Sequence, residues 1–379
     1  MKIGIDARFF GPKCKGLGRY VQKLLEYLEE ADHENEYFVF LTKEGFSNYQ
    51  PRRSNFKKVL ADYRWYTFKE QIFFPKLLNK YELDLVHFCH FNVPVLYFRP
   101  FIVTIHDLIL FHYPTIKNTK LNRFFYFCKL GAYHLVIRLA IFRARKIIAV
   151  SEFTRKDIIS KTGVRENKIR VVYEGYEIQK NSLENNKGKN DFSSKYDIMK
   201  PYIIYVGNAY PHKNLERLCL AFSSLQKRFG GLKLLLVGES DYFYGCLKRF
   251  VEERRIKNII FTGFVDDIEL DHLYKNAECF VFPSLYEGFG LPPLEALSRG
   301  TAVTCSRAGS IPEITGREAE YFDPEKENSI AASISRILSD KKYAKRIVQR
   351  SKPFLGRFSW QKMAREIKDE YLKITDKKV

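Results

Sequence analysis

The sequence predicts an α/β protein with two doubly wound parallel-sheet domains. Short apolar runs typical of buried strands alternate with helical stretches, and this alternating series occurs twice along the chain. A polar segment rich in Asn, Lys and Ser, with almost no apolar periodicity, separates the two series. The length of 379 residues suits two ordinary domains better than one, and the 45% of hydrophobic residues is enough to fill two cores.

Each half can be followed strand by strand. The first half is expected to contain the strands IGID, YFVFL, LVHF, FIVTIH, KIIAVS and IRVVY, and the second half YIIYVG, LKLLLVG, NIIFTG, CFVF and TAVTC. We therefore expect a Rossmann-like domain at 1–178, a linker at 179–200 and a second Rossmann-like domain at 201–356. The remaining residues, 357–379, include an amphipathic stretch, SWQKMAREIKDEYLKI, that predicts a terminal helix.

The stretch from Phe282 to Pro312, FPSLYEGFGLPPLEALSRGTAVTCSRAGSIP, carries the most functional information. It lies within a βαβ unit, because the apolar strand CFVF enters it and the strand TAVTC follows a helical segment. Two carboxylates, Glu287 and Glu295, stand on either side of the turn that leads into this helix. Open parallel sheets bind their ligands at the carboxyl ends of their strands, where this turn lies.

The turn suits a nucleotide or a sugar. Its glycines let the backbone approach a ligand, and the amides ahead of a helix starting near Pro292 or Pro293 suit an anionic or oxygen-rich partner. We expect Glu295 in the first helical turn, where it can accept hydrogen bonds from vicinal hydroxyls, while Glu287 meets a second polyol. Alternatively, Glu295 only complements the helix dipole and Glu287 is a solvated loop residue. The turn residues expected to face the ligand are Gly288, Phe289, Gly290 and Leu291.

Three segments of the first half place candidate residues at strand ends. IDARFFGPKCKGLGRY supplies Gly16 and Gly18 ahead of a helix expected from near Arg19, and such a passage permits close approach to phosphate. The strand FIVTIHDL puts the imidazole of His106 at the carboxyl edge of the sheet, unless this residue only caps the strand. AVSEFTRKDI predicts a mainly architectural helix with Ser151 as its N-cap.

The second half contains a basic loop, YVGNAYPHKNLERL, directly after a strand. Gly207 and Asn208 form its turn, and His212 and Lys213 precede the next helix. Lys213 can neutralise a phosphate, or it is an ordinary solvated lysine at a helix start.

Farther on, FTGFVDDIEL places Gly263, Phe264 and Val265 at the end of another strand. One of the two following aspartates, Asp266 or Asp267, is expected to cap the next helix.

The sequence offers little for a metal ion. The run HFCH holds His87, Cys89 and His90, but strand alternation sends the two histidines to opposite faces and no fourth ligand is evident. No two Asp residues stand two apart anywhere in the chain. We therefore expect no metal and no cofactor, so side chains, amides and helix dipoles would neutralise any anionic leaving group.

The net charge of +20 is unevenly distributed. The span 108–151 contains no acid, and it carries the aromatic cluster FFYF at 124–127. Bases interleaved with aromatics on helices are typical of a surface that rests on anionic lipid headgroups. Nucleic acid is the competing polyanion, and an ordinary helix pair with a solvated basic face is the structural alternative. The bases in this span are Lys117, Lys120, Arg123, Lys129, Arg138, Arg143, Arg145 and Lys146.

Cysteine usage favours a reducing compartment. Seven cysteines are scattered without a C-x-x-C pair, and the chain enters the strand KIGIDA without a signal peptide. No apolar run approaches the roughly 18 residues that a membrane-spanning helix needs. We expect a cytoplasmic protein, either soluble or peripheral on the inner membrane face.

Taken together, these motifs resemble those of the retaining glycosyltransferases of family 4, which have the GT-B fold. The resemblance rests on EGFGLPPLEAL with its two glutamates, on GSIPE after it, and on the ordered landmarks from Lys2 to about Tyr371. It implies two domains that face a cleft and a nucleotide-sugar donor held mainly by the second domain. It also implies that the terminal helix crosses back to the first domain. The divalent-metal motif of the other large glycosyltransferase fold is missing.

The resemblance gives each candidate residue a role. Lys213 would be the main cation on the donor diphosphate, with His212 as a pH-dependent helper, since Asn208 stands where the family usually has Arg. Glu287 would orient the sugar hydroxyls, Glu295 would hold the ribose, and His106 would contact the sugar near the reacting carbon. The loop with Gly16 and Gly18 would close over the diphosphate, the turn at Gly207 would belong to the positive loop, and the backbone of 263–265 would cradle the base.

We interpret the chain as a retaining, metal-independent glycosyltransferase similar to mannosyltransferases of surface polysaccharide assembly. The favoured donor is GDP-mannose, and the expected acceptor is a saccharide or a lipid-linked saccharide. We also expect residues 108–151 to meet an anionic membrane surface, and we expect no nucleic-acid partner. Two alternatives stay open. A nucleotide-sugar epimerase of the same fold would need further acid and base groups and no acceptor, and a non-enzymatic binder of anionic lipid or nucleic acid would use only the basic face.

Overall fold

A computed structural model of the chain describes residues 1–11, 14–114, 123–177 and 201–375. Its contacts divide the chain into two compact units, Met1–Gly175 with Phe358–Val379 (unit 1) and Tyr176–Arg357 (unit 2). Both are α/β units with a parallel sheet, which confirms the predicted fold class. The expected linker at 179–200 lies outside the described residues, as do Lys117, Lys120 and the side chains of 123–126.

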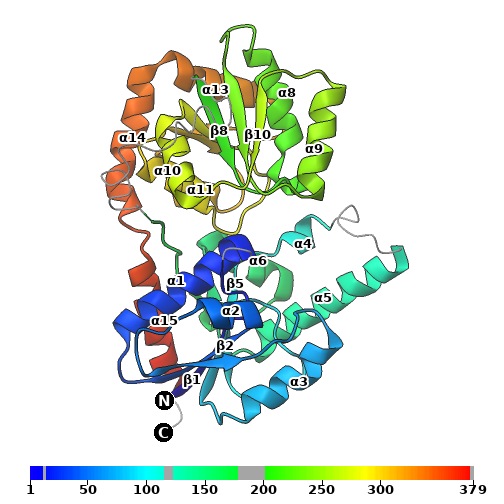
Figure 1. The fold of residues 1–379 in the computed structure, drawn as a ribbon, viewed down its shortest axis with the longest axis vertical. Helices are drawn as coiled ribbons and strands as arrows, with labels where there is room; N and C mark the ends of the chain where they lie inside the picture. The colour runs from blue at the N-terminus through cyan, green and yellow to red at the C-terminus, as the bar shows by residue number, and fades with distance from the viewer. Residues whose placement is uncertain (12–13, 115–122, 178–200, 376–379) are drawn as a thin grey trace. The chain divides into compact units, whose positions relative to one another are not determined.

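Unit 1 is built on a seven-stranded parallel sheet in the order β3-β2-β1-β4-β5-β6-β7 (Figure 1). The connections run outward from β1 on one side and from β4 on the other, so the strand order reverses between these two strands. The strands are β1 (Lys2–Asp6), β2 (Glu36–Leu41), β3 (Phe56–Leu60), β4 (Leu85–Phe88), β5 (Phe101–Ile105), β6 (Lys146–Ala149) and β7 (Ile169–Val171).

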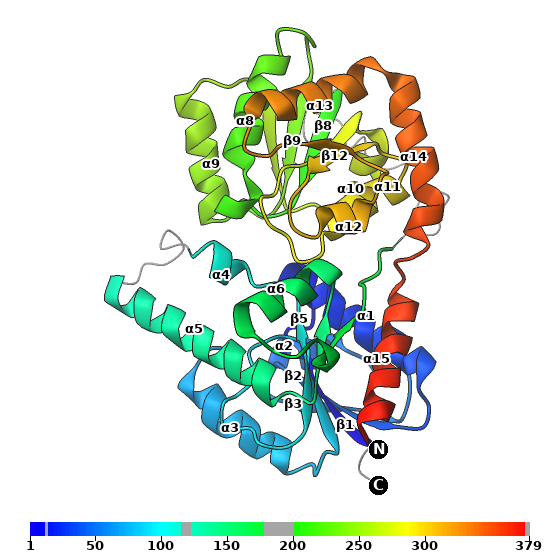
Figure 2. The same cartoon turned by 180° about the vertical axis from the view of Figure 1, so that it is seen from behind.

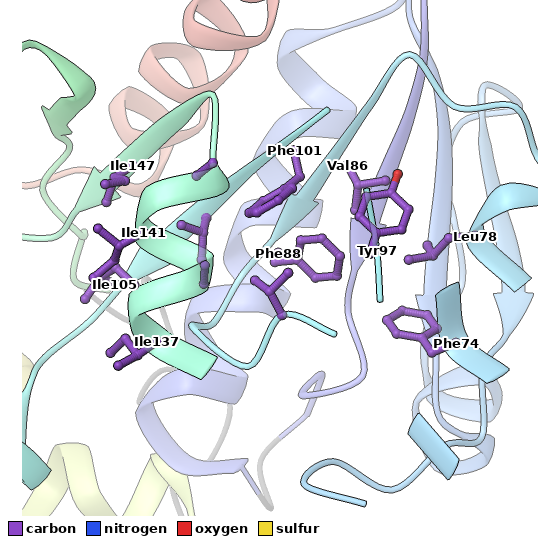
Figure 3. Packing of buried hydrophobic residues seen from close by; sticks show 14 of the residues in the cluster. Phe74, Leu78, Val86, Phe88, Tyr97, Phe101, Ile105, Ile137, Ile141 and Ile147 are labelled. Carbon is purple, nitrogen blue, oxygen red and sulfur yellow. The ribbon is translucent and has the colours of Figure 1, made fainter. Parts of the chain in front are cut away.

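Helices cover both faces of this sheet. The helical segments are α1 (Lys15–Ala31), α2 (Lys43–Asn48), α3 (Phe68–Asn79), α4 (Ile109–His112), α5 (Arg123–Arg143), α6 (Glu152–Thr162), η3 (Glu166–Lys168) and α15 (Trp360–Thr375). Figure 3 shows one core layer, in which Phe74 and Leu78 of α3 and Ile137 and Ile141 of α5 pack with apolar side chains of the strands. Because both helices contribute to this core, α3 and α5 cover the same face of the sheet.

The terminal helix α15 packs along α1 in unit 1. Lys368 donates from Nζ to the carbonyl of Ala31 at 2.9 Å, close to the end of α1. The hydroxyl of Tyr371 lies 2.6 Å from Nδ1 of His87 on β4, deep in the unit. The last helix of the chain is therefore part of the core that supports the first sheet.

Unit 2 repeats the architecture with a six-stranded parallel sheet in the order β10-β9-β8-β11-β12-β13. Its strands are β8 (Tyr202–Val206), β9 (Lys233–Val237), β10 (Ile259–Gly263), β11 (Cys279–Phe282), β12 (Val303–Ser306) and β13 (Glu320–Phe322). Its helical segments are η4 (Pro211–Lys213), α8 (Leu215–Leu225), α9 (Tyr242–Glu253), α10 (Asp267–Asn276), α11 (Leu291–Ser298), α12 (Ile311–Thr315), α13 (Glu327–Ser339) and α14 (Lys341–Leu355).

One predicted boundary in unit 1 was wrong. The helix expected from near Arg19 begins a turn earlier, at Lys15, so Gly16 and Gly18 lie inside α1 and not ahead of it. The reason is a close approach of the chain to itself, since a Cβ on Gly18 would stand 1.9 Å from the carbonyl oxygen of Gly11. Glycine at this position lets the first turn of α1 pack against the loop after β1.

None of the helices in the described ranges combines the length and the apolar composition that crossing a bilayer requires.

Candidate active site

The loops after β8 and β11 bring the expected cation to a carboxylate. These strands are neighbours at the point where the strand order of unit 2 reverses. Lys213, at the end of η4, reaches Glu287 in the loop after β11, with 2.6 Å between Nζ and Oε1. The two side chains are only 13% and 9% exposed. Because an ammonium has three N–H donors, Lys213 can hold a phosphate oxygen while it keeps Glu287.

His212 lies beside this pair but is uncharged near neutral pH. Its burial, together with the neighbouring charge of Lys213, lowers the pKa of His212 to about 4, although Glu287 opposes the shift. The residue therefore adds no positive charge to the loop at pH 7 and becomes charged only in acid. Its carbonyl instead accepts a hydrogen bond from the amide of Leu285 at 2.7 Å, which ties the two loops together.

Gly207 and Asn208 shape the turn after β8. Gly207 has φ near +151°, and its carbonyl accepts a hydrogen bond from the Tyr244 hydroxyl at 2.8 Å. The carbonyl of Asn208 accepts from the Tyr205 hydroxyl at 2.7 Å, and its side-chain oxygen accepts from the amide of Tyr210 at 3.3 Å. In this structure the Asn208 side chain therefore supports its own loop.

Asn214, which was not singled out from the sequence, supports the loop after β8. It has a left-handed backbone, with φ +60°, and it precedes α8 directly. Its side-chain amide donates to the carbonyls of Pro283 at 3.2 Å and Pro324 at 2.7 Å. Asn214, which directly follows Lys213, thus anchors this loop to the end of β11. An asparagine at a turn that requires positive φ was the available signal.

The segment after β12 packs against the backbone of the loop that carries Glu287, which we call the glutamate loop. A Cβ on Gly309 would stand 2.7 Å from the amide nitrogen and 2.8 Å from the carbonyl oxygen of Glu287. The hydroxyl oxygen of Ser310 lies 2.6 Å from the carbonyl oxygen of Phe289 and 3.0 Å from that of Glu287, so its one proton can be donated to either carbonyl. The pair GS of the motif GSIPE therefore fixes the backbone of the glutamate loop.

Glu295 lies on α11 but not in its first turn, so that expectation was wrong. Gly290, with φ +104°, is the N-cap, and the helix begins at Leu291. Glu295 therefore falls in the second turn and is only 6% exposed. Its Oε2 accepts a hydrogen bond from the hydroxyl of Tyr274 at 3.3 Å. This contact orients a buried carboxylate.

The segment after β10 follows the expected geometry. Gly263 has φ +73° and its carbonyl accepts from the amide of Gly238 at 3.2 Å, at the end of the neighbouring strand. Phe264 is 73% exposed, whereas Val265 is buried. Asp266 is the N-cap of α10 and accepts from two backbone amides, so the first of the two aspartates is the cap.

In unit 1, His106 stands at the end of β5 between two hydrogen-bond acceptors. Nδ1 lies 3.0 Å from Oε1 of Glu174, and Nε2 lies 3.1 Å from the carbonyl oxygen of Cys89. The ring also meets the edge of Tyr20, with centroids 4.7 Å apart. His106 at the end of β5 is thus bonded to the segments that follow β4 and β7, which strand capping alone does not require.

This arrangement favours a positively charged imidazole. A carboxylate and a carbonyl can only accept, so both ring nitrogens must carry a proton to satisfy them. Burial alone would lower the pKa of His106, but the hydrogen bond and charge of Glu174, with the Cys89 carbonyl and Asp107, raise it above its ordinary value. Glu174, which follows β7 in the run VVYEGY, was not predicted from the sequence as a partner of His106.

The expected site residues therefore fall into two groups. Unit 2 holds the loop after β8 (207–213), the loop after β11 with α11 (287–295) and the end of β10 (263–265), and a printed contact joins the first two through Lys213 and Glu287. Unit 1 holds His106, Gly16 and Gly18. Around Gly16 a Cβ would meet nothing within 4 Å, so the space beside this residue is open, unlike that beside Gly18.

The histidines of HFCH are engaged within unit 1. His87 lies between the hydroxyls of Tyr371 and Thr104, at 2.6 and 2.8 Å from its ring nitrogens, and burial lowers its pKa to about 3. Nδ1 of His90 accepts from the amide of Asn92 at 3.3 Å. Within the described ranges, no group of three or more His, Cys, Asp or Glu side chains is arranged to hold a metal ion.

Family models match both halves of the chain. The model described as Glycosyltransferase Family 4 matches residues 15–180, and the model described as Glycosyl transferases group 1 matches residues 186–353. Together the two matches span most of the sequence. The chain therefore belongs to the family 4 and group 1 glycosyltransferases of GT-B fold, and it is a nucleotide-sugar-dependent glycosyltransferase.

Two curated relatives are mannosyltransferases by name. The O-antigen chain mannosyltransferase RfbU of Salmonella typhimurium is 28% identical over 276 residues, which cover 72% of this chain and 70% of the relative. The O-antigen chain mannosyltransferase B of Escherichia coli is 28% identical over 294 residues, which cover 75% of this chain and 73% of the relative.

Among solved structures, Anabaena Alr3699/HepE in complex with UDP-glucose is similar with a TM-score of 0.74. The likeness covers 98% of this chain and 99% of that one at 15% identity, so it shows a shared fold.

Proposed function

We propose that this glycosyltransferase is a retaining enzyme that transfers mannose from GDP-mannose to a saccharide acceptor without a metal ion. The observation that carries the proposal is the buried pair of Lys213 and Glu287 at the strand-order reversal of unit 2, followed on α11 by the buried Glu295. This set provides a cation for a diphosphate and two carboxylates for hydroxyl groups in one unit.

The departing nucleoside diphosphate is the group that needs stabilisation. Lys213 supplies a fixed charge, and the amino-terminal end of α11, which begins at Leu291, supplies backbone amides and the positive end of a helix dipole. Gly16 in α1, where a Cβ would meet no atom of the described residues within 4 Å, is a further proposed contact for phosphate. These groups perform the neutralisation that a divalent metal performs in other transferases.

The carboxylates have separate roles in the proposal. Glu287 accepts hydrogen bonds from sugar hydroxyls while Lys213 keeps it oriented, and Glu295, oriented by Tyr274, accepts from the ribose hydroxyls. The imidazolium of His106 is the unit 1 group that we propose to contact the donor sugar. The bond from the anomeric carbon to the phosphate oxygen breaks, and the acceptor oxygen bonds to the same face of that carbon. The acceptor proton passes to the leaving phosphate oxygen.

The names of the relatives support mannose and a saccharide acceptor of the O-antigen kind. Two O-antigen mannosyltransferases align with almost three quarters of this chain. The acceptor we propose is a lipid-linked saccharide at the inner, cytoplasmic face of a membrane, as an intermediate of cell-surface polysaccharide synthesis. The acid-free span 108–151 is the proposed contact with that membrane surface.

The test is a transfer assay with labelled GDP-mannose, a panel of lipid-linked saccharides and EDTA. The proposal predicts an α-linked mannosyl product whose formation does not depend on added divalent ions. A β-linked product would overturn the retaining mechanism, and loss of activity in EDTA that Mg²⁺ restores would overturn metal independence. Isomerisation of the donor without any acceptor would identify an epimerase instead.

A matched pair of lysine variants ties the activity to the site. Lys213→Ala should lower kcat/KM by about a hundredfold or more, because a charge aimed at the leaving group is lost. Lys341→Ala is the control, since Lys341 pairs with Glu278 and is 60% exposed. Equal activity of the two variants would contradict the assigned role of Lys213.

A further inference from the structure

Unit 1 carries an exposed apolar surface on the outer side of α3 and α5 that the donor site does not use. Its two most exposed members are Phe68, at 89%, and Phe98, at 79%. We call it the α3–α5 surface; its exposed apolar side chains are Phe68, Ile72 and Phe73 of α3, Leu96 and Phe98 of the loop 94–99, and Leu135 and Phe142 of α5.

The loop 94–99 joins the two helices into one surface. The amide of Val95 donates to Oε1 of Gln71 on α3 at 2.7 Å. On the other side, Nη1 of Arg143 at the end of α5 donates to the carbonyl of Val95 at 2.7 Å. The guanidinium carbon of Arg143 also stands 4.7 Å from the ring centroid of Phe98. The exposed rings therefore lie on segments that are bonded to one another.

The core of unit 1 does not need these side chains. Phe74, Leu78, Ile137 and Ile141 of the same two helices point into the core, and so does Tyr97 between the exposed Leu96 and Phe98 (Figure 3). Seen from behind, α3 and α5 run along the same side of unit 1 (Figure 2). Several exposed large apolar side chains on adjoining elements are unusual for a surface that faces only water.

All exposed charges of the α3–α5 surface are basic. Lys69 and Lys76 are exposed on α3, Arg99 in the loop, and Lys129 and Arg138 on α5. The single acid of α3, Glu70, is buried in an ion pair with Arg8. In the sequence from 85 to 151 the only acid is Asp107. The surface therefore combines exposed aromatic and aliphatic side chains with charges that are all positive.

We propose that the α3–α5 surface rests on an anionic lipid bilayer. Its rings would enter the headgroup region while the surrounding bases meet the lipid phosphates. The proposal rests on the proposed function, in which the acceptor is lipid-linked, and it extends the membrane contact from 108–151 to α3 and the loop 94–99. A nucleic acid would also match the bases, but it would leave the aliphatic members Ile72, Leu96 and Leu135 without a purpose.

The test is sedimentation with vesicles of phosphatidylcholine, with and without phosphatidylglycerol, at low and high salt. The wild type should bind only the anionic vesicles, and salt should weaken the binding. The double variant Phe68→Ser/Phe98→Ser should bind at least about tenfold more weakly, because two exposed rings no longer enter the interface. Tyr242→Ser is the matched control, since Tyr242 is 63% exposed in unit 2, and it should bind like the wild type.

Each contrary outcome overturns the proposal. Wild type that ignores anionic vesicles, or a double variant that binds them as well as the wild type does, contradicts it. If the double substitution changes only the oligomeric state, the surface is an interface between copies of the chain; if the wild type binds RNA but not vesicles, the partner is a nucleic acid. Thermal stabilisation by GDP-mannose without vesicles is measured in parallel, so that a failure of the donor site is recognised separately.

Discussion

The substitution Gly309→Ala isolates the support behind the glutamate loop. Gly309 has φ +60°, and alanine in this left-handed region costs about 1–2 kcal/mol. The new Cβ would also stand 2.7 Å and 2.8 Å from backbone atoms of Glu287, which must shift. Overpacking of this kind costs about 1–3 kcal/mol, so we expect a total loss of about 3 kcal/mol. In a unit of this size that corresponds to a fall in Tm of about 6–12 °C.

The same shift displaces the carboxylate that pairs with Lys213, so donor affinity should fall about tenfold as well. Differential scanning calorimetry gives the Tm, and isothermal titration calorimetry gives the Kd for the nucleotide sugar. Gly300→Ala is the control: Gly300 also has positive φ, +82°, but a Cβ there meets nothing within 4 Å. It should lose only about 1–2 kcal/mol and bind donor normally. If Gly309→Ala behaves like this control, Gly309 does not position Glu287.

Three further substitutions test other contacts. Glu174→Gln should lower the pKa of His106, which NMR titration measures. In the wild type, the stabilisation from the charged pair is present below about pH 6.5 and is lost as the pH rises through the raised pKa of His106. An unchanged titration of His106 in the variant would contradict the pairing. The pKa of His212 in the folded protein is about 4, so protonation of this buried ring should lower the free energy of unfolding of unit 2 by up to about 3 kcal/mol as the pH falls from about 6.5 to 4. His212→Asn should remove this pH dependence, as measured by urea titrations at several pH values. Tyr371→Phe leaves Nδ1 of His87 without its hydroxyl partner and should destabilise unit 1 by about 1–3 kcal/mol in chemical denaturation; no change would mean that this buried contact is not needed.

The central strands of both sheets were predictable because they are buried on both faces and read as continuous apolar runs. Of the four edge strands, β3 and β13 were not predicted. β3 reads FKKVL, with lysines that an edge strand can expose, and β13 has only three residues, EYF. Neither gives the apolar run that identifies a buried strand, although pairing with a neighbour is enough to form each of them.

The residues of the proposed donor site could be predicted from the sequence, but the residues that hold them in place could not. The spacing of Glu287 and Glu295 is local, and so is the position of Lys213 before a helix. Ser310 reaches Glu287 across 23 residues, and Glu174 reaches His106 across 68. Such contacts depend on which strands lie side by side, and a single sequence does not state that order. The first-turn position expected for Glu295 failed for a local reason, since the positive φ of Gly290 starts α11 at Leu291.

Calorimetric titration of GDP-mannose in EDTA, with the wild type, Glu295→Gln and Glu278→Gln, tests the donor site most directly. Glu278 is a matched control because it pairs with Lys341 at the start of β11, at the opposite end of the strand from the glutamate loop. We expect binding to the wild type and to Glu278→Gln, and a Kd at least about tenfold higher for Glu295→Gln. Equal affinity of all three proteins, or no binding of any nucleotide sugar to the wild type, would contradict the donor site described for unit 2.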